Sequence, residues 1–575
     1  MKIKNMTKQE RTGLIAFIIA IIITSICMFI FIGQKAGWHE DEIFSYGASN
    51  YRYDNMFQTS GHKDEFNKLV DEKIMSTRWI QTLKNLAHYT INYSEFFSEL
   101  EERYEKQAPA WKTSEQAKEY MTVSEDEVFS YWSVYYNQSR DVHPPLFYML
   151  VHFVSSLCLN HFSKYIIFTI NLVFYVASCC TIYKILKLFH KENLSAIVVL
   201  LYGLSMGGIT TVIFQRMYMM LTFFILTYLY LNLKICKNEF VISKSTKREL
   251  IVTVILGFLT QYYFCIYALL LAIISVGIMI KQKKFVELKY YIWCHILAAI
   301  IGVLLFPASI YHIFFSYRGV AGGVVNVSYI ERLKQYFKLL FYSFSLPELL
   351  GYIVFAVLMI LVIYKMITGK RKDIIFMVSI PTILFIFMIA KISPMVNIRY
   401  ISPIFPIIAV AVIWIAERIM NTSVKVLFKK MANKKVFWQK NTAMIIITML
   451  TVSLSAYGLK NSEPYFIYKN YKQRIELAET YQNLKLVYIG EAPFNHLQDM
   501  EEFLIYQNSI IVNTWELEAL KNNEGLADEK EFILNMKCWI SNFDENLHKV
   551  LNYTNATNYE LLLDDGESRL YKVKR

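Results

Sequence analysis

Residues 13–33, GLIAFIIAIIITSICMFIFIG, decide the broad class of this 575-residue chain. The run of about 20 mostly apolar residues is long enough to cross the hydrocarbon core of a bilayer. Directly after it the sequence turns acidic, with His39-Glu40-Asp41-Glu42. Carboxylates at a membrane surface repel one another beside a medium of low dielectric constant. The cluster is therefore either a solvated rim or a site that needs a base or an ion.

The composition extends the membrane interpretation to the whole chain. Hydrophobic residues make up 55% and aromatic residues 16% of the sequence, and the mean hydropathy is +0.31, which indicates an integral membrane protein. The net charge of +13 does not indicate nucleic-acid binding, because the Lys and Arg residues form no single continuous basic stretch and many of them lie in short loops between apolar runs. The first segment has no small-residue cleavage site after it, so we expect a retained anchor. The eight cysteines form no disulfide or zinc pattern.

Clusters of Lys and Arg predict which loops face the cytoplasm, because positive charge is retained on that side. These clusters lie at residues 2–11, 184–191, 234–248, 281–289, 365–372 and 418–440. The apolar runs between them predict spans at residues 13–33, 165–183, 194–209, 212–233, 250–260, 263–280, 291–315, 351–364, 374–390, 401–416 and 443–459. We therefore expect about eleven spans in the cell membrane, with the N-terminus in the cytoplasm and the C-terminal domain outside.

One apolar run, at residues 144–159, does not fit as a further span, because it would place Lys184 outside. Its Pro-Pro start and shorter length favour an interfacial or re-entrant helix.

The expected fold is mainly α, a polytopic helical membrane protein of four parts. These are an anchor helix at 1–33, a helical first outer loop with the interfacial helix at 34–163, a polytopic domain at 164–460 and a small α/β outer domain at 461–575. In the last part, the sequence predicts strands at 485–489, 509–513 and 560–563 and helical stretches near 496–506 and 528–540.

Four polar features are expected to meet at the outer face. They are the acidic cluster with Glu40, Asp41 and Glu42, the loop end with Asp141 and His143, the segment with Arg216 and Tyr218, and the segment with Arg399 and Tyr400. Transfer from a lipid phosphate suits this set. Arginine binds phosphate through a planar fork, and a desolvated aspartate can accept a proton from an attacking hydroxyl.

Each feature also has a plainer interpretation. Asp41 and Glu42 could be ordinary solvated acids after a helix. Arg216 and Arg399 could be snorkelling anchors at helix ends. The tyrosines, including Tyr262 and Tyr263, could belong to the aromatic belt of the membrane interface. The plainer interpretation does not require all four features on one side, and their joint occurrence favours a site.

The motifs resemble those of the GT-C glycosyltransferases, which include the protein O-mannosyltransferases and the aminoarabinose transferases of lipid A. Residues 38–46, WHEDEIFSY, look like the Asp-Glu motif of the family's first outer loop, and residues 141–146, DVHPPL, are similar to the His-Pro-Pro-Leu segment that ends this loop. Residues 216–218 and 399–400 resemble further recurring segments. The resemblance covers roughly residues 13–416.

The resemblance implies an inverting membrane glycosyltransferase that uses a polyprenyl-phosphate sugar on the outer face. It implies Asp41 as general base, Glu42 as its neighbour, and Arg216 and Arg399 as contacts of the lipid phosphate. His143, Tyr218 and Tyr400 would complete the substrate site. Relatives often carry His where this chain has Gln261, and Gln cannot titrate. Some members use a divalent metal ion and others do not, so the resemblance leaves a metal cofactor open.

A transporter or flippase of a lipid-linked saccharide is the alternative from another class, since it would share the basic loops and the outer acids. It would carry charges near the middle of the bilayer and internal repeats, and the sequence shows few of the former and no evident repeat. An inactive relative that serves as a scaffold is a third possibility. The expected partners are a polyprenyl-phosphate-linked sugar, an acceptor of undetermined class and membrane lipid. The sequence does not identify the sugar.

Overall fold

The structure is a computed structural model that describes residues 8–53, 57, 68, 71–91, 109–315, 328–369, 372–429, 436–492 and 494–575. The chain forms two compact units. The helical unit contains Met1–Gly33 and Phe168–Tyr465, and the mixed unit contains Gln34–Ile167 and Phe466–Arg575. The predicted basic clusters at 2–11, 365–372 and 418–440 lie partly outside the described residues.

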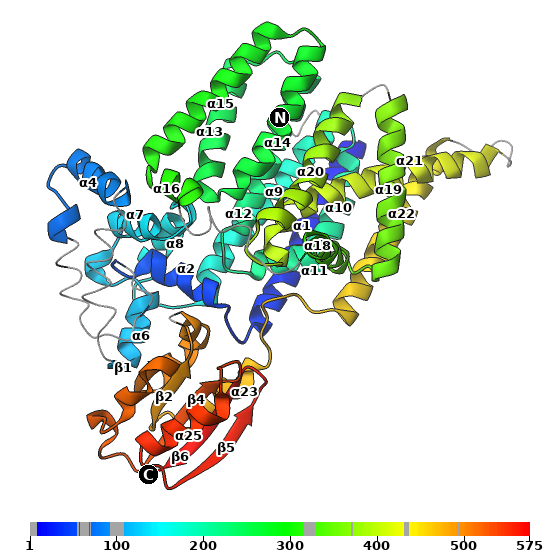
Figure 1. Cartoon of the computed structure of the whole chain (residues 1–575). Coiled ribbons are helices and arrows are strands. Elements are labelled where there is room, and N and C mark those ends of the chain that lie inside the picture. The colour runs from blue at the N-terminus through cyan, green and yellow to red at the C-terminus, as the bar shows by residue number, and fades with distance from the viewer. Residues whose placement is uncertain are drawn as a thin grey trace. The chain divides into compact units, whose positions relative to one another are not determined.

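The helical unit is built from long apolar helices and a few short ones (Figure 1). Helix α9 begins four residues before the boundary of this unit at Phe168. The described elements are α1 (Lys8–Gln34), α9 (Lys164–Leu188), η3 (Glu192–Leu194), α10 (Ser195–Gly203), α11 (Met206–Ile213), α12 (Tyr218–Lys237), α13 (Lys244–Thr260), α14 (Tyr263–Lys281), α15 (Phe285–Leu305), α16 (Ala308–Phe314), α18 (Tyr329–Ser343), α19 (Glu348–Thr368), α20 (Lys372–Ile392), η4 (Ile398–Tyr400), η5 (Ser402–Ile404), α21 (Phe405–Lys429) and α22 (Val436–Asn461).

Nine helices among the described residues are long and apolar enough to cross a membrane: α1, α9, α12, α14, α15, α19, α20, α21 and α22. Isoleucines along α1 expose about half of their surface, for example Ile15 at 57% and Ile22 at 52%. A continuous row of exposed apolar side chains is unfavourable in water and favourable in the hydrocarbon core of a membrane. The protein is therefore a multi-pass membrane protein, as the sequence predicts.

Three predicted spans differ in detail. The span at 194–209 is a pair of helices, α10 and α11, bent by 72°, and together they raise the number of spanning elements to ten. The span at 291–315 ends at Leu305, because Pro307 has no N–H to donate and is the N-cap of the separate short helix α16. The span at 250–260 lies in α13, which has 17 residues and begins with a charged turn, KSTKRE. The structure thus has nine or ten candidate spans among the described residues, where the sequence predicts about eleven.

The mixed unit combines the first outer loop with the C-terminal region. Its described elements are α2 (Glu40–Asn50), α4 (Trp79–Ile91), β1 (Trp111–Thr113), α6 (Ser114–Met121), η2 (Glu125–Glu127), α7 (Tyr131–Arg140), α8 (Leu146–Ser156), α23 (Tyr471–Thr480), β2 (Lys485–Gly490), η6 (Asn495–Asp499), α24 (Met500–Ile505), β3 (Asn508–Asn513), η7 (Thr514–Leu520), η8 (Glu524–Leu526), β4 (Glu531–Lys537), α25 (Phe543–Tyr553), β5 (Asn558–Asp564) and β6 (Ser568–Lys574). The predicted interfacial helix is α8, whose 11 residues span about 16 Å and cannot cross a bilayer.

A six-stranded sheet with the order β1-β3-β2-β4-β6-β5 organises the mixed unit. The three central strands are parallel. The edge strand β1 pairs antiparallel with β3, with Trp111 opposite Ile510. The first outer loop and the C-terminal region, which the sequence divides into two domains, therefore share one sheet. Helix α25 covers one face, where its Leu547 and Val550 pack on the core.

One secondary-structure prediction in this unit is wrong. Residues 528–540 are not helical, since β4 occupies Glu531–Lys537 in the middle of the sheet. Phe532 and Leu534 point into the core beneath α25, while Ile533 and Asn535 are buried on the opposite face. A strand buried on both faces has no alternation of apolar and polar residues, so its sequence does not distinguish it from a helix.

Candidate active site

The acidic motif is the start of a helix. His39 is the N-cap of α2, and its Nδ1 accepts a hydrogen bond of 3.1 Å from the backbone N–H of Asp41. The Glu42 carboxylate accepts a bond of 2.8 Å from the backbone N–H of His39. This reciprocal capping box satisfies two amides at the helix start. The carboxylate of Asp41 lies 3.5 Å from His39 Nδ1, at the positive end of the helix dipole, which favours a negative charge.

Asp41 and Glu42 have different surroundings. The side chain of Asp41 is 23% exposed, whereas that of Glu42 is fully buried against Lys35, with 2.8 Å between Nζ and Oε2. The same ammonium group donates to the backbone carbonyl of Phe466. Burial lowers the pKa of Lys35, and the charge of Glu42 opposes this shift. Glu42 is therefore held as an ion-pair partner, while Asp41 keeps access to its surroundings.

His143 lies in the short connection between α7 and α8, and both helices pack against α2. Its Nδ1 contacts the carboxylate of Asp141, and the two side chains are 8% and 16% exposed. An aspartate on Nδ1 fixes the orientation of the ring. The mixed unit thus holds Asp41, Glu42 and His143 on neighbouring elements.

The two predicted arginines belong to the helical unit, and both are buried. Arg216 is 2% exposed between α11 and α12, and Arg399 is 8% exposed in η4. The Arg399 guanidinium donates to the Tyr400 hydroxyl at 3.0 Å, and its central carbon lies 5.8 Å from the centre of the Phe214 ring. Two segments far apart in the sequence therefore meet at Arg399.

Aromatic rings complete this arginine cluster. Tyr218 packs edge-on against Tyr400 with 6.1 Å between ring centres, and Phe214 stacks on Tyr218 at 6.0 Å. Tyr263, interpreted from the sequence as a belt residue, packs on Tyr400 at 5.4 Å. Phe214 lies in the predicted segment with Arg216 and Tyr218, but the sequence predicts neither Phe214 nor Tyr263 to be a residue of the substrate site, although each is next to a polar break between apolar runs.

A metal-binding constellation is absent from the described part of the chain: no three His, Cys, Asp or Glu residues lie close enough together to hold an ion.

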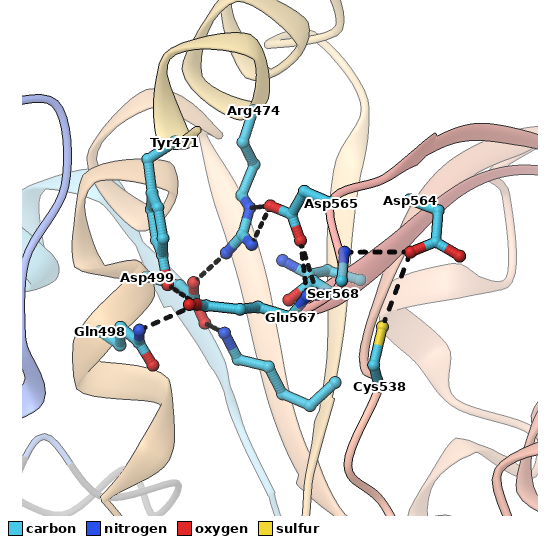
Figure 2. A network of polar contacts seen from close by, with 12 residues as sticks. Tyr471, Arg474, Gln498, Asp499, Cys538, Asp564, Asp565, Glu567 and Ser568 are labelled. Carbon is cyan, nitrogen blue, oxygen red and sulfur yellow. Dashed lines mark hydrogen bonds and ion pairs between the residues drawn. The ribbon is translucent and has the colours of Figure 1, made fainter. Parts of the chain in front are cut away.

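A buried ionic network in the C-terminal region also escaped sequence analysis (Figure 2). The guanidinium of Arg474, fully buried on α23, contacts Asp499, Glu502 and Asp565. Lys537 on β4 lies 2.5 Å from the second carboxylate oxygen of Asp499. These residues are spread over more than 90 positions of the sequence. The residues around each of them give no sign that the charged side chain is buried.

The network lies next to the chain that leads into the acidic motif. Tyr471, one turn before Arg474, donates its hydroxyl hydrogen to Glu567. A Cβ on Gly37 would come within 2.6 Å of the Tyr471 ring and 2.8 Å of Tyr468. Glycine at position 37 therefore allows the segment before α2 to pack closely on α23 and its preceding turn.

No family model matches the chain, and no curated protein matches it. Similar solved structures include two of ArnT. A crystal structure of ArnT from Cupriavidus metallidurans bound to undecaprenyl phosphate has 10% sequence identity and a TM-score of 0.48, covering 96% of this chain and 97% of that chain. The apo structure of ArnT from the same organism has 10% identity and a TM-score of 0.45, covering 75% of this chain and 87% of that chain. ArnT is thus a structural neighbour of this chain.

Proposed function

We propose that this protein is a membrane glycosyltransferase that moves a sugar from a polyprenyl-phosphate donor to an acceptor hydroxyl. Asp41 is the general base in this proposal, and Glu42 is a positioning residue beside it. Arg216 and Arg399 bind the lipid phosphate, and His143, Tyr218 and Tyr400 contribute to the substrate site.

The observation that carries the proposal is the contrast between the two neighbouring carboxylates. A general base must reach the proton that it removes. Glu42 is sealed against Lys35, whereas the Asp41 carboxylate is 23% exposed at a helix N-terminus. Glu42 is thus fixed by its buried ion pair, while the adjacent Asp41 carboxylate is partly accessible.

The arginine cluster supports the donor assignment. Guanidinium groups bind phosphate oxygens through paired N–H donors, and charge developing on a departing phosphate is stabilised most strongly where water is excluded. Arg216 and Arg399 are both buried, and the Phe214 and Tyr400 rings that lie against the Arg399 guanidinium are apolar surfaces of the kind that a sugar or an isoprenoid chain packs against.

The reaction proceeds in a single displacement. The acceptor oxygen attacks the anomeric carbon and forms the new C–O bond, while the bond from that carbon to the phosphate oxygen breaks. The electron pair leaves on the phosphate beside the arginines, and Asp41 takes the proton of the acceptor hydroxyl. Attack opposite to the leaving group inverts the anomeric configuration.

The test is incubation of the purified protein in detergent with a panel of polyprenyl-phosphate sugars and candidate acceptors. We expect release of free polyprenyl phosphate in an amount equal to the glycosylated product, for at least one sugar. A saccharide transporter gives a different result, because it moves the intact donor across a proteoliposome membrane without releasing lipid phosphate. Movement without release would replace the enzyme proposal by the transporter.

A further inference from the structure

A cavity of about 340 Å³ lies between α9, α12 and α13 of the helical unit. It is lined by Thr181, Lys184, Phe223, Phe224, Thr227, Tyr230, Leu231, Glu249, Val252, Thr253 and Leu256. None of these residues belongs to the motifs or the arginine cluster described above. They lie toward the helix ends that the basic clusters predict to face the cytoplasm.

Helices α9 and α12 contact each other at two positions along their length, one near the helix ends and one deeper in the unit. At the helix ends, Lys237 on α12 donates to the backbone carbonyl of Leu188 on α9. Deeper in the unit, the Phe174 ring of α9 packs on Phe223 and Phe224 at 5.6 Å and 6.3 Å between ring centres. Phe223 lies about 21 Å from Lys237 along the helix axis at 1.5 Å per residue. The cavity-lining residues of α12, from Phe223 to Leu231, extend over about 12 Å of the helix axis.

The lining changes from charged to apolar along this axis. Lys184 and Glu249 lie near the helix ends, whereas Phe223 and Leu256 lie deeper. The hydroxyl of Thr227, between these levels, is buried and has no hydrogen-bond partner among the described residues. A charged head, a polar middle and an apolar tail are the profile of a membrane lipid standing parallel to the helices.

The charged residues at the open end of the cavity determine which charge a bound lipid head group should carry. Glu249 pairs with Lys234 at 3.1 Å and accepts from the Ser245 hydroxyl at 2.8 Å, so its charge is already compensated. Lys184 is exposed and attracts Glu249 electrostatically, but it makes no ion pair or hydrogen bond with any residue that the structure describes. Two lysines and one glutamate leave one uncompensated positive charge at the mouth of the cavity.

We propose that this cavity binds an anionic phospholipid of the membrane. The phosphate of the head group lies at Lys184, an ester oxygen accepts the hydroxyl hydrogen of Thr227, and an acyl chain lies against Phe223, Phe224 and Leu256. Basic pockets between membrane helices recognise anionic lipid heads in this way. This lipid site is independent of the proposed glycosyl transfer.

Native mass spectrometry of the full-length protein in mixed micelles tests the site, with phosphatidylglycerol and phosphatidylcholine as probes. We expect phosphatidylglycerol to bind more tightly. Lys184→Ala should weaken its binding about fivefold, the effect of one basic residue at a lipid head. Leu256→Trp should reduce binding by filling the apolar part. Lys281→Ala, an exposed lysine at the end of α14 outside the cavity, should leave it unchanged.

Equal binding of the two phospholipids would overturn the proposal, and so would unchanged phosphatidylglycerol binding in both cavity variants. Two further probes test the identity of the ligand. Polyprenyl phosphate that bound more tightly than phosphatidylglycerol and lost binding in the same variants would replace the phospholipid. Inorganic phosphate that displaced phosphatidylglycerol at millimolar concentration would show that the apolar part contributes nothing. These measurements record lipid binding and not transferase activity, so their outcome does not depend on the proposed function.

Discussion

The ammonium of Lys35 and the carboxylate of Glu42 form an ion pair of 2.8 Å in which the side chains are only 1% and 0% exposed. Lys35 also holds the carbonyl of Phe466, a residue with the uncommon left-handed backbone φ of 68°. The pair thus connects the chain before α2, the first turn of α2 and the start of the C-terminal region. Three parts of the mixed unit depend on one buried contact.

Glu42→Gln should destabilise this connection by about 3 kcal/mol, because removal of one partner leaves a buried charge uncompensated. Gln can still accept the hydrogen bond of the capping box, so the variant isolates the effect of charge. Hydrogen exchange of the α2 amides in micelles should accelerate accordingly. The double variant Lys35→Met/Glu42→Gln should regain part of the protection. Exchange unchanged from that of the parent protein would mean that the pair contributes nothing.

A matched control is the exposed pair Lys472–Glu476 on α23, at 3.7 Å and 76% and 60% exposed. Glu476→Gln should change stability by less than about 0.5 kcal/mol, the usual range of surface pairs.

Gly37→Ala should destabilise the mixed unit by about 1–3 kcal/mol, the usual cost of overpacking, because the new methyl group would overlap the Tyr471 ring. Thermal unfolding of the purified protein measures the effect. Gly277→Ala on α14 is the control, since nothing lies within 4 Å of its added Cβ. Equal unfolding temperatures for the two variants would show that the close approach at position 37 is relaxed at little cost.

Arg399→Ala should raise the KM for the polyprenyl-phosphate donor about 10- to 100-fold and change the acceptor KM little, because a hydrogen bond to a charged group contributes about 1.5–3 kcal/mol. Steady-state kinetics with each substrate varied in turn separates the two constants. Arg418→Ala, at an exposed position on α21, provides the comparison for loss of a guanidinium elsewhere. An unchanged donor KM in Arg399→Ala would make Arg399 a structural anchor.

The C-terminal network should make stability depend on pH. Burial raises the pKa of Glu502 from 4.5 to about 7, and Arg474 opposes this shift. A carboxyl group with a raised pKa in the folded state binds its proton more tightly there, so its stabilising contribution is complete below pH 4.5 and is lost as pH rises through 7. The mixed unit should lose up to about 3 kcal/mol between pH 5 and 8.

The measurement is hydrogen exchange of the strand amides across that range, corrected for intrinsic exchange rates. Glu502→Gln should flatten the dependence, because Gln mimics the protonated acid. Glu545→Gln on the surface of α25 should preserve it. A parent protein that became more stable toward pH 8 would contradict the assigned direction.

Patterns of burial along the chain explain which elements could be predicted from sequence. Helix α1 is a continuous apolar run, and β2 and β3 lie within short apolar runs between turn residues, so hydropathy finds all three. The helix predicted over β4 failed because both faces of that strand are buried. The strand β1 has three residues and exists only through pairing with β3, almost 400 positions away, which local sequence does not record.

The candidate site divides in the same way. The capping pattern of residues 39–42 and the Arg-Tyr segments are local and visible in the sequence. The different burial of Asp41 and Glu42 depends on Lys35 and on the distant Phe466, and the Arg474 network depends on five separate segments of the chain. Such tertiary partners determine which of several similar carboxylates is accessible, and a single sequence contains no signal for them.

The central claim is that Asp41 removes the proton of the acceptor while a polyprenyl phosphate leaves. The most direct measurement is the single-turnover rate of lipid-phosphate release by Asp41→Asn, with Glu125→Gln, an exposed acid of the same unit, as control. The account predicts a rate about 10²- to 10⁴-fold lower for Asp41→Asn, with donor binding retained and the control unchanged. Release by Asp41→Asn at the rate of the parent protein would contradict it.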